Sequence, residues 1–245
     1  MFTKKKKQES LREFLEQGNE VILPQDIWNI IDKQTRGDDV ITQTIQFIRD
    51  ILEPQPGRYD RTYRYEHTLR VAAIGQQIAQ EENLPEEPLI IACLLHDLGY
   101  ILCTCFEDFC VHQIISEKIA REYLQKIEYF EYLDTICRAI LFHNMKHQIP
   151  ETATPFEISV MDADDIDRFD MMRLCEMGSR DVGEKSASEI IAQCKSRLEQ
   201  IDQSENRPCG TKYAERRWKE QLHIRRDFYS RLLTQMQSTM NLLDK

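Results

Sequence analysis

Residues 86–99 of the chain read EEPLIIACLLHDLG. Two acidic residues and a proline open this segment, as they often open a helix, and seven apolar residues follow from Leu89 to Leu95. An apolar run of this length would also suit a buried strand, but the opening residues favour a helix that is buried all round. His96 and Asp97 end the run, just before Gly99. The segment therefore predicts a buried helix with a histidine and an aspartate at its end.

The neighbouring segments predict helices that carry a histidine on the apolar face. His67 begins a stripe of apolar residues at helical spacing within residues 65–82, and His112 begins another within 112–127. A third stripe, over 133–143, ends at His143. Strand signals are nearly absent, and eight glycines and eight prolines give little punctuation. The sequence therefore predicts an all-α fold.

Two breaks in the helical pattern, PQPG at 54–57 and PCG at 208–210, suggest how the chain is organised. We expect a tail and helical extension over 1–56, a main domain over 57–205 and a C-terminal helix over 206–245. Other helices are expected near 27–31, 40–52, 158–177 and 184–202. The aromatic and methionine stripe of the long last helix predicts packing on the domain or in a homodimer.

Composition narrows the class of protein. With 32 basic and 42 acidic residues the net charge is -10, which argues against extensive binding of nucleic acid. Eight irregularly spaced cysteines without a secretory signal predict reduced thiols and a cytoplasmic protein. The lysines at 4–7 are expected to form a solvated tail, since no apolar segment follows them. No apolar run approaches the roughly 18 residues of a membrane span.

Six side chains of the predicted helices are of the kinds that bind transition metals. They are His67, His96, Asp97, His112, His143 and Asp164. Burying an unpaired carboxylate is costly, whereas a bound cation lets it stay ionised. Imidazoles suit Fe, Mn, Co, Ni and Zn, and one carboxylate can bridge two ions, an arrangement that activates water for hydrolysis of a phosphoester. The competing interpretation is a set of core histidines with a solvated acidic face at 162–167.

Three short motifs in this order resemble the HD-domain metal-dependent phosphohydrolase superfamily: RYEHTLRVA at 64–72, LLHDLG at 94–99 and ADDID at 163–167. The resemblance implies an HD-type helical domain whose first ion is held by His67, His96, Asp97 and Asp164. It makes Asp97 the bridging ligand, and Asp97 and His96 the catalytic pair. Helical periodicity does not decide whether Asp162 or Asp164 is the ligand. Asp164 is favoured only because Ala163-Asp164 resembles the family's Ala-Asp motif.

His112 and His143 are similar to the extra histidines of the two-metal branches of that superfamily. The resemblance therefore implies one or two divalent ions, preferably two, with Fe or Mn favoured over Co, Ni, Zn or Mg. Asn144 stands where cyclic-dinucleotide phosphodiesterases of the superfamily usually have a second histidine, and their Gly-Tyr-Pro signature is missing. A phosphohydrolase acting on a nucleotide or related small phosphoester is expected. Three alternatives stay open: a cyclic- or dinucleotide phosphodiesterase, a single-metal 5'-nucleotidase, and a nonenzymatic nucleotide-binding sensor.

Several basic residues near these motifs could hold a substrate phosphate. Arg64 and Arg70 flank His67 on one side of its helix, where charge-assisted hydrogen bonds to phosphate are expected, although ion pairing on the helix surface would explain them equally well. Further candidates are Lys146, His147 and Arg168. Cys103, Cys105 and Cys110 could bind zinc, but the short C-x-C spacing lacks a second matching pair. These thiols are expected to pack.

Overall fold

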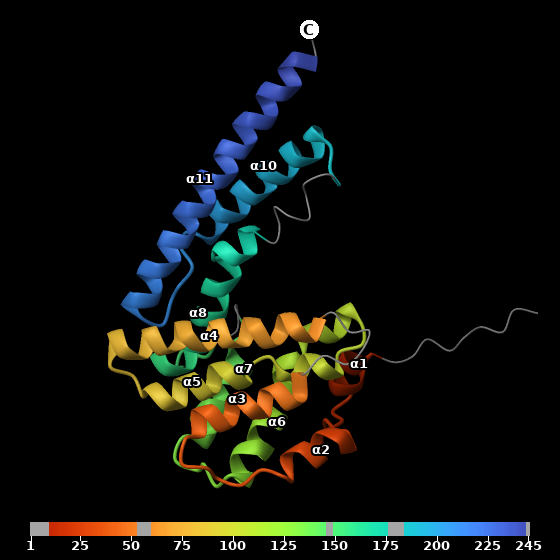
Figure 1. The fold of residues 1–245 in the computed structure, drawn as a ribbon, viewed down its shortest axis with the longest axis vertical. Coiled ribbons are helices and arrows are strands. Elements are labelled where there is room, and N and C mark those ends of the chain that lie inside the picture. The colour runs from red at the N-terminus through yellow and green to blue at the C-terminus, as the bar shows by residue number, and fades with distance from the viewer. Residues whose placement is uncertain (1–9, 53–59, 146–148, 176–183, 244–245) are drawn as a thin grey trace, which may run out of the picture.

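The computed structural model describes residues 10–52, 60–145, 149–175 and 184–243, and none of these residues lies in a strand. The all-α prediction is confirmed (Figure 1). The elements in chain order are α1 Leu11–Glu16, α2 Gln25–Ile31, α3 Val40–Leu52, α4 Asp60–Glu82, α5 Glu86–Leu95, the 3-10 helices η1 Leu98–Leu102 and η2 Phe106–Cys110, α6 His112–Lys126, α7 Leu133–Phe142, α8 Pro155–Phe169, α10 Ala187–Ser204 and α11 Lys212–Leu243.

Helix α5 is the centre of the fold. Every residue from Pro88 to Leu95 is buried, and α3, α4, α7 and α8 all pack against it. Glu86 and Glu87 lie in its first turn, where their charge complements the helix dipole. The predicted helix, buried all round, is therefore confirmed. Because α5 is enclosed on all sides, the His96-Asp97 pair at its end lies inside the protein.

A close approach at Gly99 joins the end of α5 to the start of α6. A β-carbon at this position would lie 2.0 Å from the carbonyl oxygen of His112 and 2.8 Å from the backbone nitrogen of Ser116. The Gly99 backbone N–H also donates to the Ser116 hydroxyl at 2.8 Å. Only glycine lets η1 pack this tightly on α6. The contact brings Asp97, two residues earlier, next to the first residue of α6.

Helix α8 is shorter than the sequence pattern predicts. It begins with a capping box at Thr154 and ends at Phe169, whereas one helix was expected over 158–177. Asp170 has extended backbone dihedrals, and its carboxylate accepts the backbone N–H of Met171 at 2.6 Å. Asp170 thus acts as a cap that ends one helix and starts another over 171–175, and the last two residues of the expected helix lie outside the described ranges.

The N-terminal helices pack on the main body. Phe47 of α3 stacks on Tyr123 of α6 with ring centroids 3.9 Å apart, and Thr44 hydrogen bonds to the Tyr123 hydroxyl at 3.0 Å. The backbone N–H of Leu11, at the start of α1, donates to the buried carboxylate of Asp108 at 2.7 Å. The helical extension therefore adds to the same core. The expected break at 54–57 lies outside the described residues.

Helices α10 and α11 form a hairpin that projects from the body (Figure 1). Only the first half of α11 reaches α4 and α8. Asp162 of α8 anchors the hairpin, because its carboxylate accepts a hydrogen bond from Arg207 and another from the backbone N–H of Gly210, both at 2.8 Å. Among the described residues, no helix is long and apolar enough to cross a membrane.

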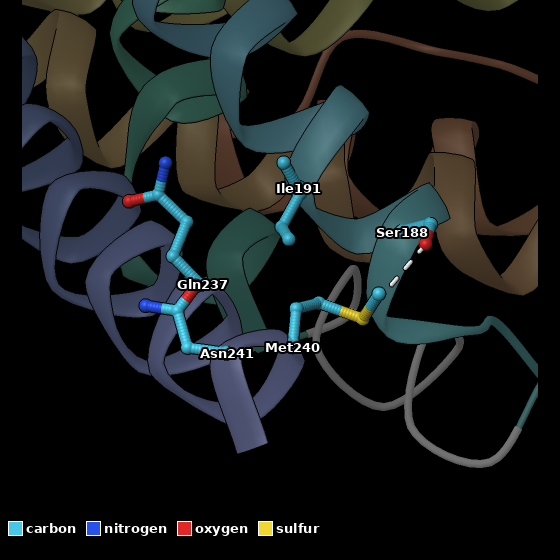
Figure 2. A pocket seen from close by; sticks show the side chains of 5 residues that line it. All are labelled: Ser188, Ile191, Gln237, Met240 and Asn241. Carbon is cyan, nitrogen blue, oxygen red and sulfur yellow. Dashed lines mark hydrogen bonds between the residues drawn. The ribbon is translucent and has the colours of Figure 1, made fainter. Parts of the chain in front are cut away.

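The outer ends of α10 and α11 enclose a shallow groove. It is lined by Ser188, Ile191, Gln237, Met240 and Asn241 (Figure 2). None of these side chains ionises between pH 4 and 10 or carries a strong nucleophile. The groove therefore offers no side chain for acid-base chemistry.

Candidate metal centre

Six side chains from five helices and one turn converge in the interior. They are His67 of α4, His96 at the end of α5, Asp97 before η1, His112 at the start of α6, His143 at the end of α7 and Asp164 of α8. Each is at most 1% exposed. Three overlapping groups bring ligand atoms within 4.8 Å of one another: His67, His96 and Asp97; His96, His143 and Asp164; Asp97, His112 and His143. The structure thus brings all six predicted ligands together.

Hydrogen bonds to backbone carbonyls fix the ring orientation of three of the four histidines. His96 and His112 direct Nδ1 to the carbonyl oxygens of Cys93 and Phe109 at 2.7 and 2.6 Å. His143 makes the same contact with the carbonyl of Ile140 at 2.6 Å. A carbonyl oxygen only accepts, so Nδ1 carries the hydrogen and the Nε2 of a neutral ring presents a lone pair. The three rings therefore aim lone pairs at the centre, as ligating histidines do.

The Asp97 carboxylate stands between these nitrogens. Its Oδ1 lies 3.4 Å from Nε2 of His96, 3.3 Å from that of His112 and 3.6 Å from that of His143. Its Oδ2 lies 3.5 Å from Nε2 of His67. One oxygen therefore faces His67, and the other faces the remaining three rings. A carboxylate so placed would offer one oxygen to a cation on each side.

The chemistry of this donor set fits bound cations. Within the described chain, Nε2 of His67, Nε2 of His96 and Oδ1 of Asp97 are buried and have no hydrogen-bond partner. The Nε2 atoms of His112 and His143 lie only 2.9 Å apart, although each ring uses its Nδ1–H elsewhere. Buried lone pairs that face one another repel unless a positive charge lies among them. Imidazole and carboxylate ligands suit divalent transition metals.

The electrostatics of the centre also favour a bound cation. Burial lowers the pKa of His96 to about 4, which keeps its imidazole in the neutral form that binds metals. Burial alone would raise the pKa of Asp97, but the adjacent His96 and the other histidines hold it well below its usual range. At His67, burial opposes the charged form, yet the carboxylates of Asp164, Asp167 and Asp97 raise its pKa. The site therefore favours positive charge among its carboxylates.

The arginines predicted to hold a phosphate are engaged with acidic side chains. Arg64 donates from one terminal nitrogen to Oδ2 of Asp97 at 2.7 Å, and its guanidinium lies over the ring of Tyr100. Arg168 donates through Nε to Asp164 at 2.9 Å. Arg70 holds both carboxylate oxygens of Asp167, at 2.7 and 3.1 Å. The other two candidates, Lys146 and His147, lie outside the described residues.

Asp167 is a site residue that the sequence did not single out. Its carboxylate lies 2.7 Å from Nδ1 of His67, and Arg70 also donates hydrogen bonds to it. It therefore orients the His67 ring, as backbone carbonyls orient the other three. Helical spacing could have indicated Asp167, because residues three apart share a helix face and Asp167 follows Asp164 at that interval.

Two tyrosines were missed as well: Tyr63 stacks on His67 and Tyr100 on His112.

The structure separates the two aspartates that periodicity left open. Asp164 lies 3.2 Å from Nε2 of His67, whereas Asp162 binds Arg207 and Gly210 on another face of α8. Among the described residues, no group of three potential ligands includes a cysteine. Cys103 contacts backbone oxygens of Gly99 and Asp108, and burial raises its thiol pKa to about 12. This agrees with packing rather than zinc binding.

Comparison with known families agrees with the geometry. The family model named HD domain matches residues 64–172, a range that contains all six converging side chains. Neither the curated proteins nor the solved structures include a significant match to the chain. The ordered motifs, the all-α fold and the buried histidine and aspartate cluster are features of one superfamily. Residues 64–172 therefore belong to the HD domain family, within the metal-dependent phosphohydrolase superfamily.

Proposed function

We propose that the protein hydrolyses a phosphoester of a nucleotide or related small molecule at a two-metal centre. One observation carries the proposal: Asp97 belongs to two groups of converging ligand atoms, one with His67 and His96 and the other with His112 and His143. A single ion needs only one such set. A second set, completed by the close pair His112 and His143, supports a second ion.

The position of each residue in the centre suggests its role. Divalent ions, when bound, lower the pKa of a coordinated water and neutralise charge on phosphoryl oxygens. His67, His96, Asp97 and Asp164 would hold one ion, and His112 and His143 would complete a second site around Asp97. Asp167 fixes Nδ1 of His67 as a hydrogen-bond donor. Burial of all six ligands excludes bulk water, which strengthens each charge interaction in the centre.

Arg64 is the best placed of the described basic residues to contact a substrate phosphate. Its side chain is 16% exposed and reaches Asp97, so it lies between the ligands and the surface. A phosphate that enters the centre would offer this guanidinium a second anionic partner. Arg70 and Arg168 have a different role in this proposal, because each balances the charge of a buried carboxylate.

The proposal is tested with purified protein loaded with Mn²⁺, Fe²⁺ or Co²⁺. We expect metal-dependent hydrolysis of a generic phosphodiester or of a nucleotide, abolished by His67→Ala and by Asp97→Ala. His112→Ala and His143→Ala separate the alternatives, since a two-metal phosphodiesterase loses its activity and a single-metal 5'-nucleotidase keeps it. His223→Ala, at an exposed position of α11, is the matched control. If the protein binds a nucleotide tightly but hydrolyses it with none of these metals, the nonenzymatic nucleotide-binding sensor is favoured instead.

Four further statements remain predictions of the sequence. They are the preference for Fe or Mn, a cytoplasmic location, a homodimer, and the division into 1–56, 57–205 and 206–245. The described structure adds one fact to the last of these, namely that α10 packs mainly on α11. Sedimentation of the intact chain would measure the oligomeric state, and limited proteolysis would locate the boundaries.

A further inference from the structure

A row of aromatic rings connects the protein surface to the metal centre. Tyr100 stacks on the ligand His112 with ring centroids 4.1 Å apart. Phe109 meets Tyr100 edge to face at 5.4 Å, and Phe106 meets Phe109 in the same way at 5.8 Å. The side chain of Phe109 is 37% exposed and that of Phe106 is 83% exposed. The row thus begins at a ligand and ends in solvent.

The outer rings of this row are held on a rigid support. Both phenylalanines belong to η2, whose turn is fixed by the buried carboxylate of Asp108. That carboxylate accepts backbone N–H groups of Thr104 and Cys105 and, from the distant α1, that of Leu11. A large apolar ring gains free energy when it leaves water. Here a well-fixed turn instead keeps Phe106 exposed, so the ring is already placed for contact with another molecule.

The neighbours of the row indicate which molecule fits. Arg64 lies over the ring of Tyr100 at 3.5 Å from its centroid and also pairs with the ligand Asp97. A cation and a metal centre therefore adjoin the inner end of the row, and bare aromatic rings form the outer end. An anionic phosphoester attached to a planar ring matches both ends at once. Base-on-aromatic stacking tolerates any nucleobase, because every base has a π-face.

We propose that Phe106 and Phe109 form a stacking site for the nucleobase of a nucleotide whose phosphate occupies the metal centre. This inference rests on the proposed function and adds the part of the substrate that lies outside the reacting group. Phe106 and Phe109 determine specificity here and take no part in the reaction. A sugar phosphate that lacks a planar ring should bind more weakly at the same site.

The test compares two ligands that differ only in the base. They are the non-hydrolysable methylene phosphonate analogues of adenosine monophosphate and of ribose 5-phosphate. Titration calorimetry with the metal-loaded full chain gives both dissociation constants. We expect the base to improve binding about tenfold, equivalent to about 1.4 kcal/mol. In the double variant F106A/F109A the two ligands should bind within about twofold of each other. The single variant Phe106→Trp, which keeps an aromatic ring at this position, should retain the preference.

Phe130→Ala is the matched control, because Phe130 is 61% exposed but lies just before the start of α7, whereas His143 follows its end. It should leave the tenfold preference unchanged, and thermal melts should show all variants folded. Equal binding of the two analogues by the wild-type protein would overturn the inference, as would a preference that survives in the double variant. A dimer that dissociates in the double variant while the base preference persists would identify a protein interface instead. Absence of hydrolysis alongside an intact base preference would refute the proposed function alone.

Discussion

Replacing Asp167 with Asn tests how the centre positions a ligand that is not held by the backbone. The Asp167 carboxylate faces two donors, Nδ1 of His67 at 2.7 Å and the guanidinium of Arg70 at 2.7 and 3.1 Å. An amide has one accepting and one donating end, so it cannot accept all three of these hydrogen bonds. With its oxygen toward His67, its NH₂ meets the Nε–H of Arg70. With its NH₂ toward His67, the ring must carry its proton on Nε2 and loses the lone pair that would bind metal.

The expected loss follows from this conflict. Removing the partner of a ligating histidine typically weakens metal binding about 10- to 100-fold. That range corresponds to about 1.4 to 2.7 kcal/mol at the ion that His67 binds. The ion held by His112 and His143 should be affected much less, because backbone carbonyls orient those rings and the substitution leaves them in place.

Calorimetric titration of Mn²⁺ into metal-free protein measures this difference. Asp165→Asn is the matched control, since Asp165 is another buried carboxylate of α8 that pairs with an arginine, Arg207, on a face away from the centre. Both variants should lose some stability, but only Asp167→Asn should bind one ion more weakly. Wild-type affinity for every ion in Asp167→Asn would refute the orienting role of Asp167.

Three more predictions concern the surroundings of the centre. Asp164→Ala should abolish the rise in melting temperature on adding Mn²⁺, whereas Asp162→Ala should keep that rise. Asp162→Ala should also lower the unfolding free energy in urea by about 3 kcal/mol, because the substitution breaks a buried ion pair. Gly99→Ala should cost about 3 kcal/mol or more in the same assay, since its methyl group would overlap backbone atoms of α6; wild-type stability would contradict the close approach. Burial would raise the pKa of Asp108, but its hydrogen bonds, led by that from Thr104, lower it overall. Asp108 should therefore stabilise the protein above its unfolded pKa of about 4, with the effect lost as pH falls through the folded value. The difference in unfolding free energy between wild type and Asp108→Asn, measured in urea, should disappear at low pH. A difference that stayed constant would contradict this.

Much of the fold followed from hydrophobic periodicity. The stripes beginning at His67 and His112 and the run before His96 are all helical, because a continuous apolar face leaves few other ways to bury that surface. The end of α8 was missed for a local reason. Asp170 looks like one more residue of an acidic helix, and only its own backbone conformation and its bond to Met171 show that it is a cap.

The candidate site was predictable where residue chemistry sufficed. Histidines on apolar faces are few, so His67, His112 and His143 could be named from sequence alone. The partners of those ligands depend on distances between elements that the sequence does not give. Asp167 contacts His67 across a separation of 100 residues. Likewise, Arg64 was predicted near a phosphate, and its contact with Asp97 appears only when α4 and the end of α5 are packed together.

The central claim is that Asp97 bridges two ions between His67 and the pair of His112 and His143. Anomalous diffraction from crystals of the intact chain loaded with Mn²⁺, with the metal content of the same sample counted, tests it most directly. We predict two peaks per chain, one on each side of the Asp97 carboxylate, and two ions per chain in the count. A single peak, or no metal among these six side chains, would contradict the account.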